Sequence, residues 1–153
     1  MKNVEFVNSR FNPDVIAFHD LAKQMAKAVG YTADLKTDKE LAQLLSLRVA
    51  QKNECSYCII LHAKTAREIG INEAKVDNIS SWYNSELYNA KEKATLAYCD
   101  VLNDGVTKDF QSYHKALTKY FDEQEIAEIA AIVINMNVWT RLKLAQGATP
   151  ILK

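Results

Sequence analysis

Thiol and imidazole side chains lie close together in one short stretch of this sequence. Cys55 and Cys58 form a C-x-x-C pair, and His62 follows four residues after the second cysteine. Positions three and four apart share one face of a helix, so a helix here brings Cys55 near Cys58 and Cys58 near His62. Two thiols in one helical turn can close to a disulfide and reopen, which makes this stretch a candidate redox centre.

Two physical effects bear on which thiol is activated. If Asn53 caps a helix, Cys55 lies in its first turn, where the partial positive charge of the helix N-terminus favours a thiolate. His62, one turn after Cys58, can instead take the proton of that cysteine, because the thiolate is the nucleophile. These effects leave open which sulfur attacks.

A zinc site and a pair of buried core cysteines are the alternative interpretations of the C-x-x-C pair. Zinc needs about four ligands, and the remaining candidates, Cys99, His19 and His114, lie on separate predicted helices without ligand spacing. Free cysteine is among the most buried residue types, so two core cysteines remain an open interpretation. We expect no metal and no cofactor, and we interpret Cys99, which lies among apolar residues, as a small core side chain.

The segments around the cysteines have the features of helices. Glycine and proline are scarce (four and two), and no window alternates convincingly between apolar and polar residues. Capping residues and apolar spacing predict one all-α domain over residues 1–153, a bundle of about six to seven helices. The first helix is expected to begin at Pro13 after Asn12, and the sixth is expected to follow Thr107. The other expected helix starts are Thr37, which opens a capping box, Asn53, Asn72, Lys91 and Asp122.

Composition excludes several classes of function. The chain has 153 residues with 19 Lys+Arg and 19 Asp+Glu, so it has no bulk charge that would attract nucleic acid or an anionic membrane. Polar residues interrupt its apolar runs before any can span a bilayer. Its first residues lack an apolar signal region, and three cysteines are too few for a secreted disulfide framework. We expect a cytoplasmic protein that binds neither nucleic acid nor membrane.

The residues around the cysteine pair resemble a known family. Residues 47–58 together with His62 resemble the core motif of the carboxymuconolactone decarboxylase superfamily, and more narrowly its alkylhydroperoxidase AhpD-like branch, with C-x-x-C-x-x-x-H. Residues 91–98 and 134–142 resemble two later helices of that family, so the resemblance covers roughly residues 35–147. It implies an all-helical, AhpD-like fold that assembles into homo-oligomers, commonly trimers or hexamers.

The resemblance also implies roles for the three residues. By position, Cys58 is the attacking thiolate, Cys55 resolves the sulfenic acid as a disulfide and then meets an external dithiol reductant, and His62 relays a proton. The implied activity is that of an antioxidant enzyme, a thiol-dependent alkyl hydroperoxide reductase or thiol–disulfide oxidoreductase acting on a hydroperoxide or a disulfide. A non-enzymatic, redox-responsive oligomer and a decarboxylase-like enzyme are the alternatives, although the decarboxylase branch generally lacks this cysteine pair.

The chain departs from the family pattern at two positions. Gln43 stands twelve residues before Cys55, where the best-studied branch has a glutamate that completes the relay. Tyr57 stands where that branch has a second histidine, and its solution pKa of about 10, against about 6.5 for histidine, makes it a poor base. Glu40 and Glu54 are the candidate substitutes in the relay. A weakened relay predicts a slower peroxidase, or a protein that mainly exchanges disulfides or senses oxidants.

Overall fold

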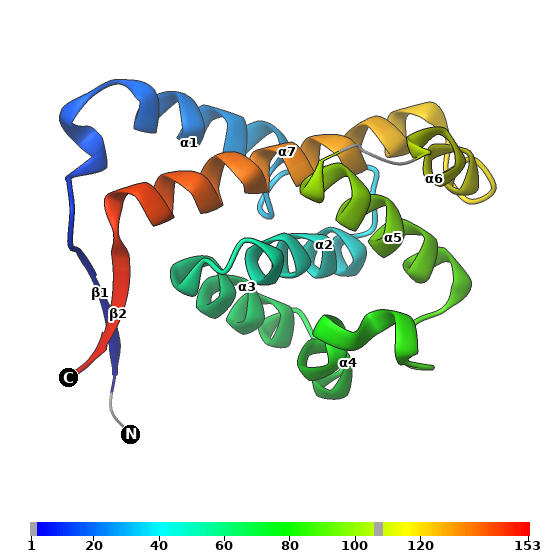
Figure 1. Ribbon diagram of the computed structural model, residues 1–153, viewed down its shortest axis with the longest axis horizontal. Helices are drawn as coiled ribbons and strands as arrows, with labels where there is room; N and C mark the ends of the chain where they lie inside the picture. The colour runs from blue at the N-terminus through cyan, green and yellow to red at the C-terminus, as the bar shows by residue number, and fades with distance from the viewer. Residues whose placement is uncertain (1–2, 106–108) are drawn as a thin grey trace.

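The computed structural model describes residues 3–105 and 109–153, and within them the chain forms a bundle of seven α-helices (Figure 1). The predicted all-α bundle is confirmed, and Thr107 lies outside the described residues. None of the described helices has the length and apolarity needed to cross a membrane. The elements in chain order are β1 (Val4–Asn8), the 3₁₀ helix η1 (Pro13–Val15), α1 (Phe18–Val29), α2 (Lys39–Lys52), α3 (Ser56–Glu68), α4 (Glu73–Asn78), the 3₁₀ helix η2 (Ile79–Asn84), α5 (Ala90–Asp104), α6 (Phe110–Leu117), α7 (Glu123–Gln146) and β2 (Ala148–Leu152).

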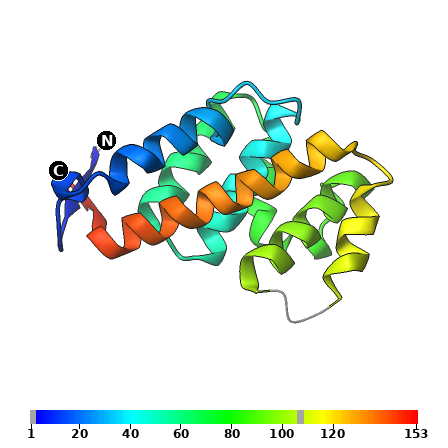
Figure 2. The same cartoon turned by 90° about the horizontal axis from the view of Figure 1, so that it is seen from above.

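Helix α2 is the central element of the bundle. It contacts α3, α5 and α7, and every residue from Leu41 to Ala50 is buried, including polar Gln43 and Arg48. The long helix α7 runs beside α1 along one side of the molecule, while α3 and α4 lie on the opposite side of α2 (Figures 1 and 2). The cysteine motif at the start of α3 therefore lies against a helix whose residues 41–50 are all buried.

Several predicted helix starts were wrong, and neighbouring side chains explain why. Asp38, not Thr37, caps α2 by accepting from the Leu41 amide at 3.0 Å. The Thr37 hydroxyl instead donates to Glu128 of α7 at 2.7 Å and ties the loop before α2 to the long helix. Asn12 caps only η1, after which extended backbone delays α1 until Phe18.

The other starts are closer to prediction. Asn72 caps α4, and Asp122 opens α7 with a capping box, both as predicted. Helix α5 begins at Ala90, one residue before the predicted Lys91, because Asn89 forms a capping box with Glu92. Helix α6 is capped by Asp109.

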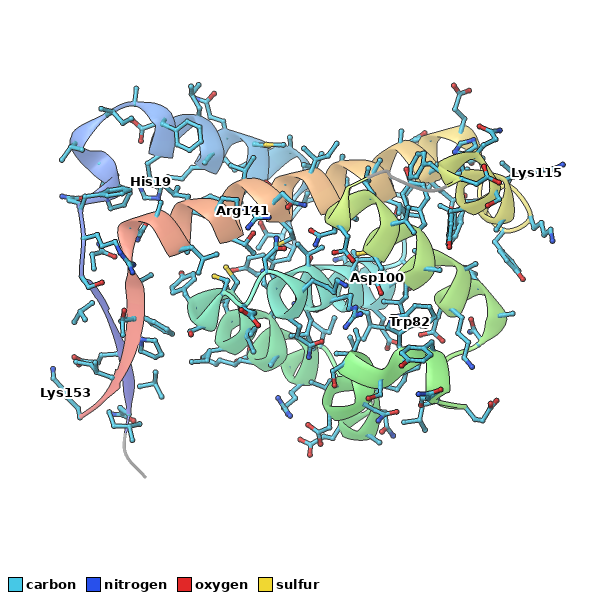
Figure 3. All side chains as sticks on the ribbon, in the orientation of Figure 1. His19, Trp82, Asp100, Lys115, Arg141 and Lys153 are labelled. Atoms are coloured by element: carbon cyan, nitrogen blue, oxygen red, sulfur yellow. The ribbon has the colours of Figure 1, made fainter. Side chains whose placement is uncertain are left out.

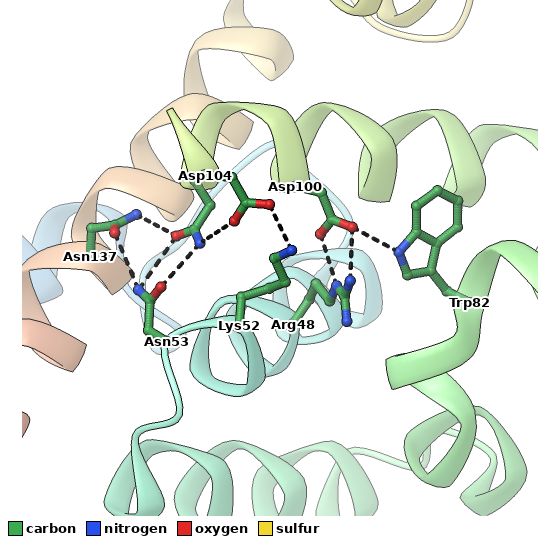
Figure 4. A network of polar contacts seen from close by, with 8 residues as sticks. Arg48, Lys52, Asn53, Trp82, Asp100, Asp104 and Asn137 are labelled. Carbon is green, nitrogen blue, oxygen red and sulfur yellow. Dashed lines mark hydrogen bonds and ion pairs between the residues drawn. The ribbon is translucent and has the colours of Figure 1, made fainter. Parts of the chain in front are cut away.

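A polar network fixes the turn that leads to the cysteines (Figure 4). Asn53, expected to cap α3, lies at the end of α2, and its side-chain amide donates to Thr140 at 2.9 Å and to Asn137 at 3.2 Å. Asn103 of α5 donates to the Asn53 carbonyl at 3.1 Å, and Asn137 donates to Asn103 at 2.9 Å. The prediction for Asn53 was wrong because its side chain bridges α5 and α7, and a different residue caps α3.

A second polar group lies farther along α2. Arg48 donates to both carboxylate oxygens of Asp100 at 2.8 Å, and the indole of Trp82 donates to the same carboxylate at 3.1 Å. Figure 4 shows this group from close by, and Trp82 and Asp100 lie well away from the terminal strands (Figure 3). Trp82 thus has a structural role, because its indole holds the carboxylate that Arg48 binds.

The two ends of the chain form a small antiparallel sheet that the sequence did not reveal. Val4 pairs with Leu152 and Asn8 with Ala148. Both strands are largely exposed, so neither shows the apolar alternation by which a half-buried strand is recognised. Phe6 of β1 packs edge-on against Tyr57 of α3, with ring centroids 4.8 Å apart. The sheet therefore places one wall beside the cysteine motif.

Candidate active site

Cys55 occupies the N-cap position of α3 itself. Its backbone is extended (φ −89°, ψ 101°), and its sulfur accepts the backbone N–H of Cys58 at 3.3 Å. The chain reverses between α2 and α3 through Glu54, which adopts a left-handed conformation at φ 54°. Cys55 and Cys58 are only 1% and 2% exposed. The tight turn therefore aims the Cys55 sulfur back at the free N–H groups of the helix start.

The two thiols are in direct contact, and their acidities diverge. Both cysteines are free, and their Sγ atoms lie 2.6 Å apart, close enough for a hydrogen bond between the two sulfurs. This hydrogen bond lowers the pKa of Cys55, and the Cys58 backbone N–H and the charge of Lys143 lower it further. The same hydrogen bond, together with burial, raises the pKa of Cys58 above its usual range. The first thiolate of the reduced pair is therefore on Cys55.

His62 is buried and held by Gln43. The amide nitrogen of Gln43 lies 2.8 Å from His62 Nδ1 and donates to the His62 carbonyl oxygen at 3.0 Å. Burial lowers the pKa of His62 to about 4, so its ring is neutral at pH 7. The sulfur of Cys55, 2.6 Å away, is the hydrogen-bond partner of the Cys58 thiol.

The four candidate relay substitutes lie in two different settings. Gln43 contacts His62 directly, as described above, and Tyr57 lines the same cavity as Cys58. Glu40 and Glu54 are both exposed to solvent and are not among the residues that line this cavity. Burial raises the pKa of Tyr57, so this phenol is a still weaker acid in the protein than in solution.

A cavity of about 360 Å³ opens beside Cys58, between α1, α3 and α7. Its walls are mainly apolar and aromatic. Cys58 and His62 line it, whereas Cys55 faces a separate recess of about 130 Å³ near Lys143 and the start of β2. Other residues that line the larger cavity are Ala26, Tyr31, Leu61, Asn135, Met136 and Trp139. A small organic molecule in this cavity would therefore meet the sulfur of Cys58.

Three residues at this site were missed by the sequence analysis. Lys143 lies over the ring of Tyr57, with Nζ 4.5 Å from the centroid, and burial lowers its pKa. Trp139 precedes it by one turn of α7, and Lys143 lies 5.6 Å from that ring as well. Tyr31, from the loop after α1, packs edge-on against His62 at 5.3 Å. The i, i+4 spacing of Trp139 and Lys143 was the only local signal, and it does not indicate which helix they face.

The remaining candidate ligands of a metal lie apart. Among the described residues, no group of three or more His, Cys, Asp or Glu side chains is arranged to hold a metal ion. His19 pairs with Asp14 at 2.6 Å near the start of α1. Cys99 is fully buried in the core, as predicted, and burial raises the pKa of its thiol.

Comparison with known proteins gives the family. The sequence model of the carboxymuconolactone decarboxylase family matches residues 17–100. The uncharacterized protein YdfG of Bacillus subtilis (strain 168) is 25% identical in an alignment 138 residues long, which covers 86% of this chain and 93% of that protein. The family match therefore spans more than half of this chain and includes the whole cysteine motif.

Solved structures share the fold. A protein of unknown function from Agrobacterium tumefaciens, provisionally assigned to the antioxidant defence protein AhpD, superposes with a TM-score of 0.79 at 21% identity, covering 90% of this chain and 91% of that chain. The debrominase Bmp8 in complex with 2,3,4-tribromopyrrole superposes with a TM-score of 0.72 at 24% identity, covering 90% and 71%. This protein belongs to the carboxymuconolactone decarboxylase family, and it has the fold of the AhpD-like branch.

Proposed function

We propose that this chain is a thiol-dependent oxidoreductase that reduces organic hydroperoxides, or exchanges disulfides, through Cys55 and Cys58. The observation that carries the proposal is the pair of free, touching sulfurs at the start of α3, of which Cys58 opens onto an apolar cavity. Family membership and the AhpD-like fold agree with it.

The chemistry balances with two thiols for each hydroperoxide. The Cys58 proton passes to the Cys55 thiolate, and the Cys58 sulfur attacks the terminal oxygen of the hydroperoxide. The O–O bond breaks, the alkoxide takes a proton from water, and Cys58 becomes a sulfenic acid. The Cys55 sulfur then attacks the Cys58 sulfur and displaces hydroxide, the proton that Cys55 had taken up passes to that hydroxide to give water, and a disulfide forms. An external dithiol returns the pair to its reduced form by exchange.

The proposal makes Cys55 the base for Cys58. Its sulfur lies 2.6 Å from the Cys58 sulfur and carries the first negative charge of the pair, and a thiolate beside a thiol can only accept. The cavity supports Cys58 as the attacking sulfur, because Cys58 lines it and Cys55 does not. His62 completes the cavity wall next to the attacking sulfur.

Thiol counting with a defined oxidant tests this function. Reduced protein is mixed with one equivalent of cumene hydroperoxide without oxygen, and free thiols and alcohol product are measured over time. We expect the wild type and the matched control Cys99→Ser each to lose two thiols and to turn over with a dithiol. Cys55→Ser lacks both the base and the resolving thiol, so it should react more slowly than the wild type and stop at a Cys58 sulfenic acid that dimedone traps. Cys58→Ser should not react. Turnover that survives in the Cys55→Ser, Cys58→Ser double variant refutes the proposal.

The same experiment separates the competing functions. Stoichiometric oxidation without turnover, with a change of assembly size, favours a redox-responsive oligomer, for which the replacement of the family glutamate by Gln43 is the supporting feature. Activity of the double variant on a lactone acid favours a decarboxylase. Loss of bromide from 2,3,4-tribromopyrrole, without hydroperoxide reduction, would place this chain with the Bmp8 chemistry.

Self-association is part of the proposal. An apolar groove lies along α7 and the segment before α1, and it includes Ile16, Phe18 and Ile134, which are 66%, 47% and 49% exposed. Apolar side chains gathered on one face favour contact with another protein surface. We propose that this face joins copies of the chain into a trimer or hexamer.

A further inference from the structure

Hydrogen bonds to His62 determine which way the side-chain amide of Gln43 is turned. Its nitrogen lies within hydrogen-bond distance of two atoms of His62, the carbonyl oxygen at 3.0 Å and the ring nitrogen Nδ1 at 2.8 Å. A backbone carbonyl oxygen can only accept, so it requires the NH₂ group of the amide. If the amide were turned over, its oxygen would face that carbonyl oxygen with no hydrogen between them. Gln43 therefore presents N–H groups to both atoms.

The tautomer of His62 follows from this orientation. One hydrogen of the Gln43 amide is donated to the His62 carbonyl oxygen, and the other points at His62 Nδ1. Nδ1 must therefore offer a lone pair. A neutral imidazole with its lone pair on Nδ1 carries its hydrogen on Nε2. Both side chains are buried, at 2% and 4% exposure, so water does not compete for these bonds. Since His62 lines the cavity and Nδ1 is occupied, Nε2 is the nitrogen left for a ligand.

We propose that Gln43 is a positioning residue that holds His62 as an Nε2–H donor toward the cavity, so that His62 donates to an oxygen of the substrate and does not take the proton of Cys58. The tautomer stands on the hydrogen bonds alone, whereas the role toward substrate rests on the proposed function. The substrate class is one whose reacting atom bears lone pairs, as both oxygens of a hydroperoxide do.

The donor has a use in the bond-breaking step. Negative charge gathers on the leaving oxygen as the O–O bond breaks, and a fixed N–H next to that oxygen stabilises it without reorganisation. Removal of one such donor lowers catalysis by roughly 100- to 1,000-fold in enzymes that use this device. A carboxylate at position 43 would reverse the ring, because it accepts Nδ1–H and leaves a lone pair on Nε2. A single change of NH₂ to oxygen thus converts His62 from a donor into a base.

The tautomer can be read directly, without any substrate. Long-range ¹H–¹⁵N NMR distinguishes the two neutral forms, and His62→Gln assigns the signals against His19 and His114. We expect Nε2–H in the wild type at pH 7, without protonation above pH 5. Gln43→Glu should move the hydrogen to Nδ1 or protonate the ring near neutral pH. The control Gln51→Glu makes the same exchange on α2 and should leave His62 unchanged.

Activity then separates this inference from the proposed function. We expect the pH profile of hydroperoxide reduction to lack a His62 inflection in the wild type and to gain one in Gln43→Glu. Gln43→Met, a similar volume without donors, should give mixed tautomers and a rate lowered in proportion to the fraction of His62 that has lost Nε2–H in the NMR spectrum. It replaces Gln43→Glu if that variant does not fold. Wild-type His62 found as Nδ1–H, or identical profiles for wild type and variants, overturns the inference. Correct tautomers without any hydroperoxide reduction would overturn the proposed function alone.

Discussion

Replacing Cys58 with alanine removes the thiol whose sulfur lies 2.6 Å from the Cys55 sulfur and which donates to that sulfur when Cys55 is ionised. The backbone N–H of residue 58, which lies 3.3 Å from the same sulfur, stays in place. The variant therefore isolates one of the interactions that hold negative charge on Cys55. We expect the pKa of Cys55 to rise while the start of α3 keeps its geometry.

The size of the rise follows from the strength of that hydrogen bond. Hydrogen bonds to charged groups contribute about 1.5–3 kcal/mol, and one pKa unit corresponds to about 1.4 kcal/mol. Because a thiol is a weak donor, the low end of this range applies, and the pKa of Cys55 should rise by about one unit and by no more than two. Cys58→Ser keeps an O–H donor at the same position and should raise the pKa less.

Alkylation measured against pH is the appropriate assay. Iodoacetamide labelling of the Cys55 peptide is followed by mass spectrometry in a Cys99→Ser background, with and without the change at Cys58. The variants are compared by the pH at which the labelling rate inflects. The labelling rate itself is not compared, because Cys55 is only 1% exposed. An unchanged or lower inflection in Cys58→Ala would show that the helix start and Lys143 alone hold the charge, and would refute the assignment of Cys55 as the base for Cys58.

Four further outcomes are expected. His62 is protonated more readily in the unfolded chain, where its pKa is about 6.5, than in the fold, where its pKa is about 4. Its contribution to the free energy of unfolding is therefore complete above about pH 6.5 and is lost as the pH falls to 4. Between these pH values, urea unfolding of His62→Gln should lose about 3 kcal/mol less of its free energy of unfolding than the wild type does. Lys143→Met should raise the alkylation inflection of Cys55, by less than Cys58→Ala does, because Lys143 is only half-buried and solvent screens its charge. Asn53→Ala strands the polar partners of the network and should lower the free energy of unfolding by about 1–3 kcal/mol. Ile16→Glu puts a charge on the exposed apolar groove and should lower the assembly mass measured by light scattering; an unchanged mass would remove this face as the interface.

Much of the fold could be predicted because its signals are local. Asn72 and Asp122 predict the starts of α4 and α7 by residue type and spacing alone. The C-x-x-C-x-x-x-H spacing places Cys58 and His62 on one helix. The prediction that Asn53 caps α3 was wrong, because the hydrogen-bond partners of Asn53, such as Asn137, come from helices distant in sequence. Hydrogen bonds between distant segments leave no trace in a local pattern.

The site shows the same division. The spacing of twelve residues before Cys55 placed Gln43 at the relay position. The role of Gln43 depends on which atom of His62 each of its N–H groups reaches, and the sequence does not contain that information. The sequence did not predict that Cys55 caps α3, because serine, threonine, aspartate and asparagine dominate the N-cap position. Lys143 acts through its place above Tyr57, which only the packing of α7 on α3 determines.

The terminal sheet has a practical consequence for anyone who shortens or extends this chain. Residues of β2 form part of the wall of the recess that the Cys55 sulfur faces, and β1 holds β2 in place. Deleting the first eight residues would therefore alter the chemistry of a cysteine more than forty positions away, although it resembles the trimming of an idle end. A tag fused at the C-terminus would extend the strand whose first residues line that recess, so rates should be compared only between proteins with identical ends.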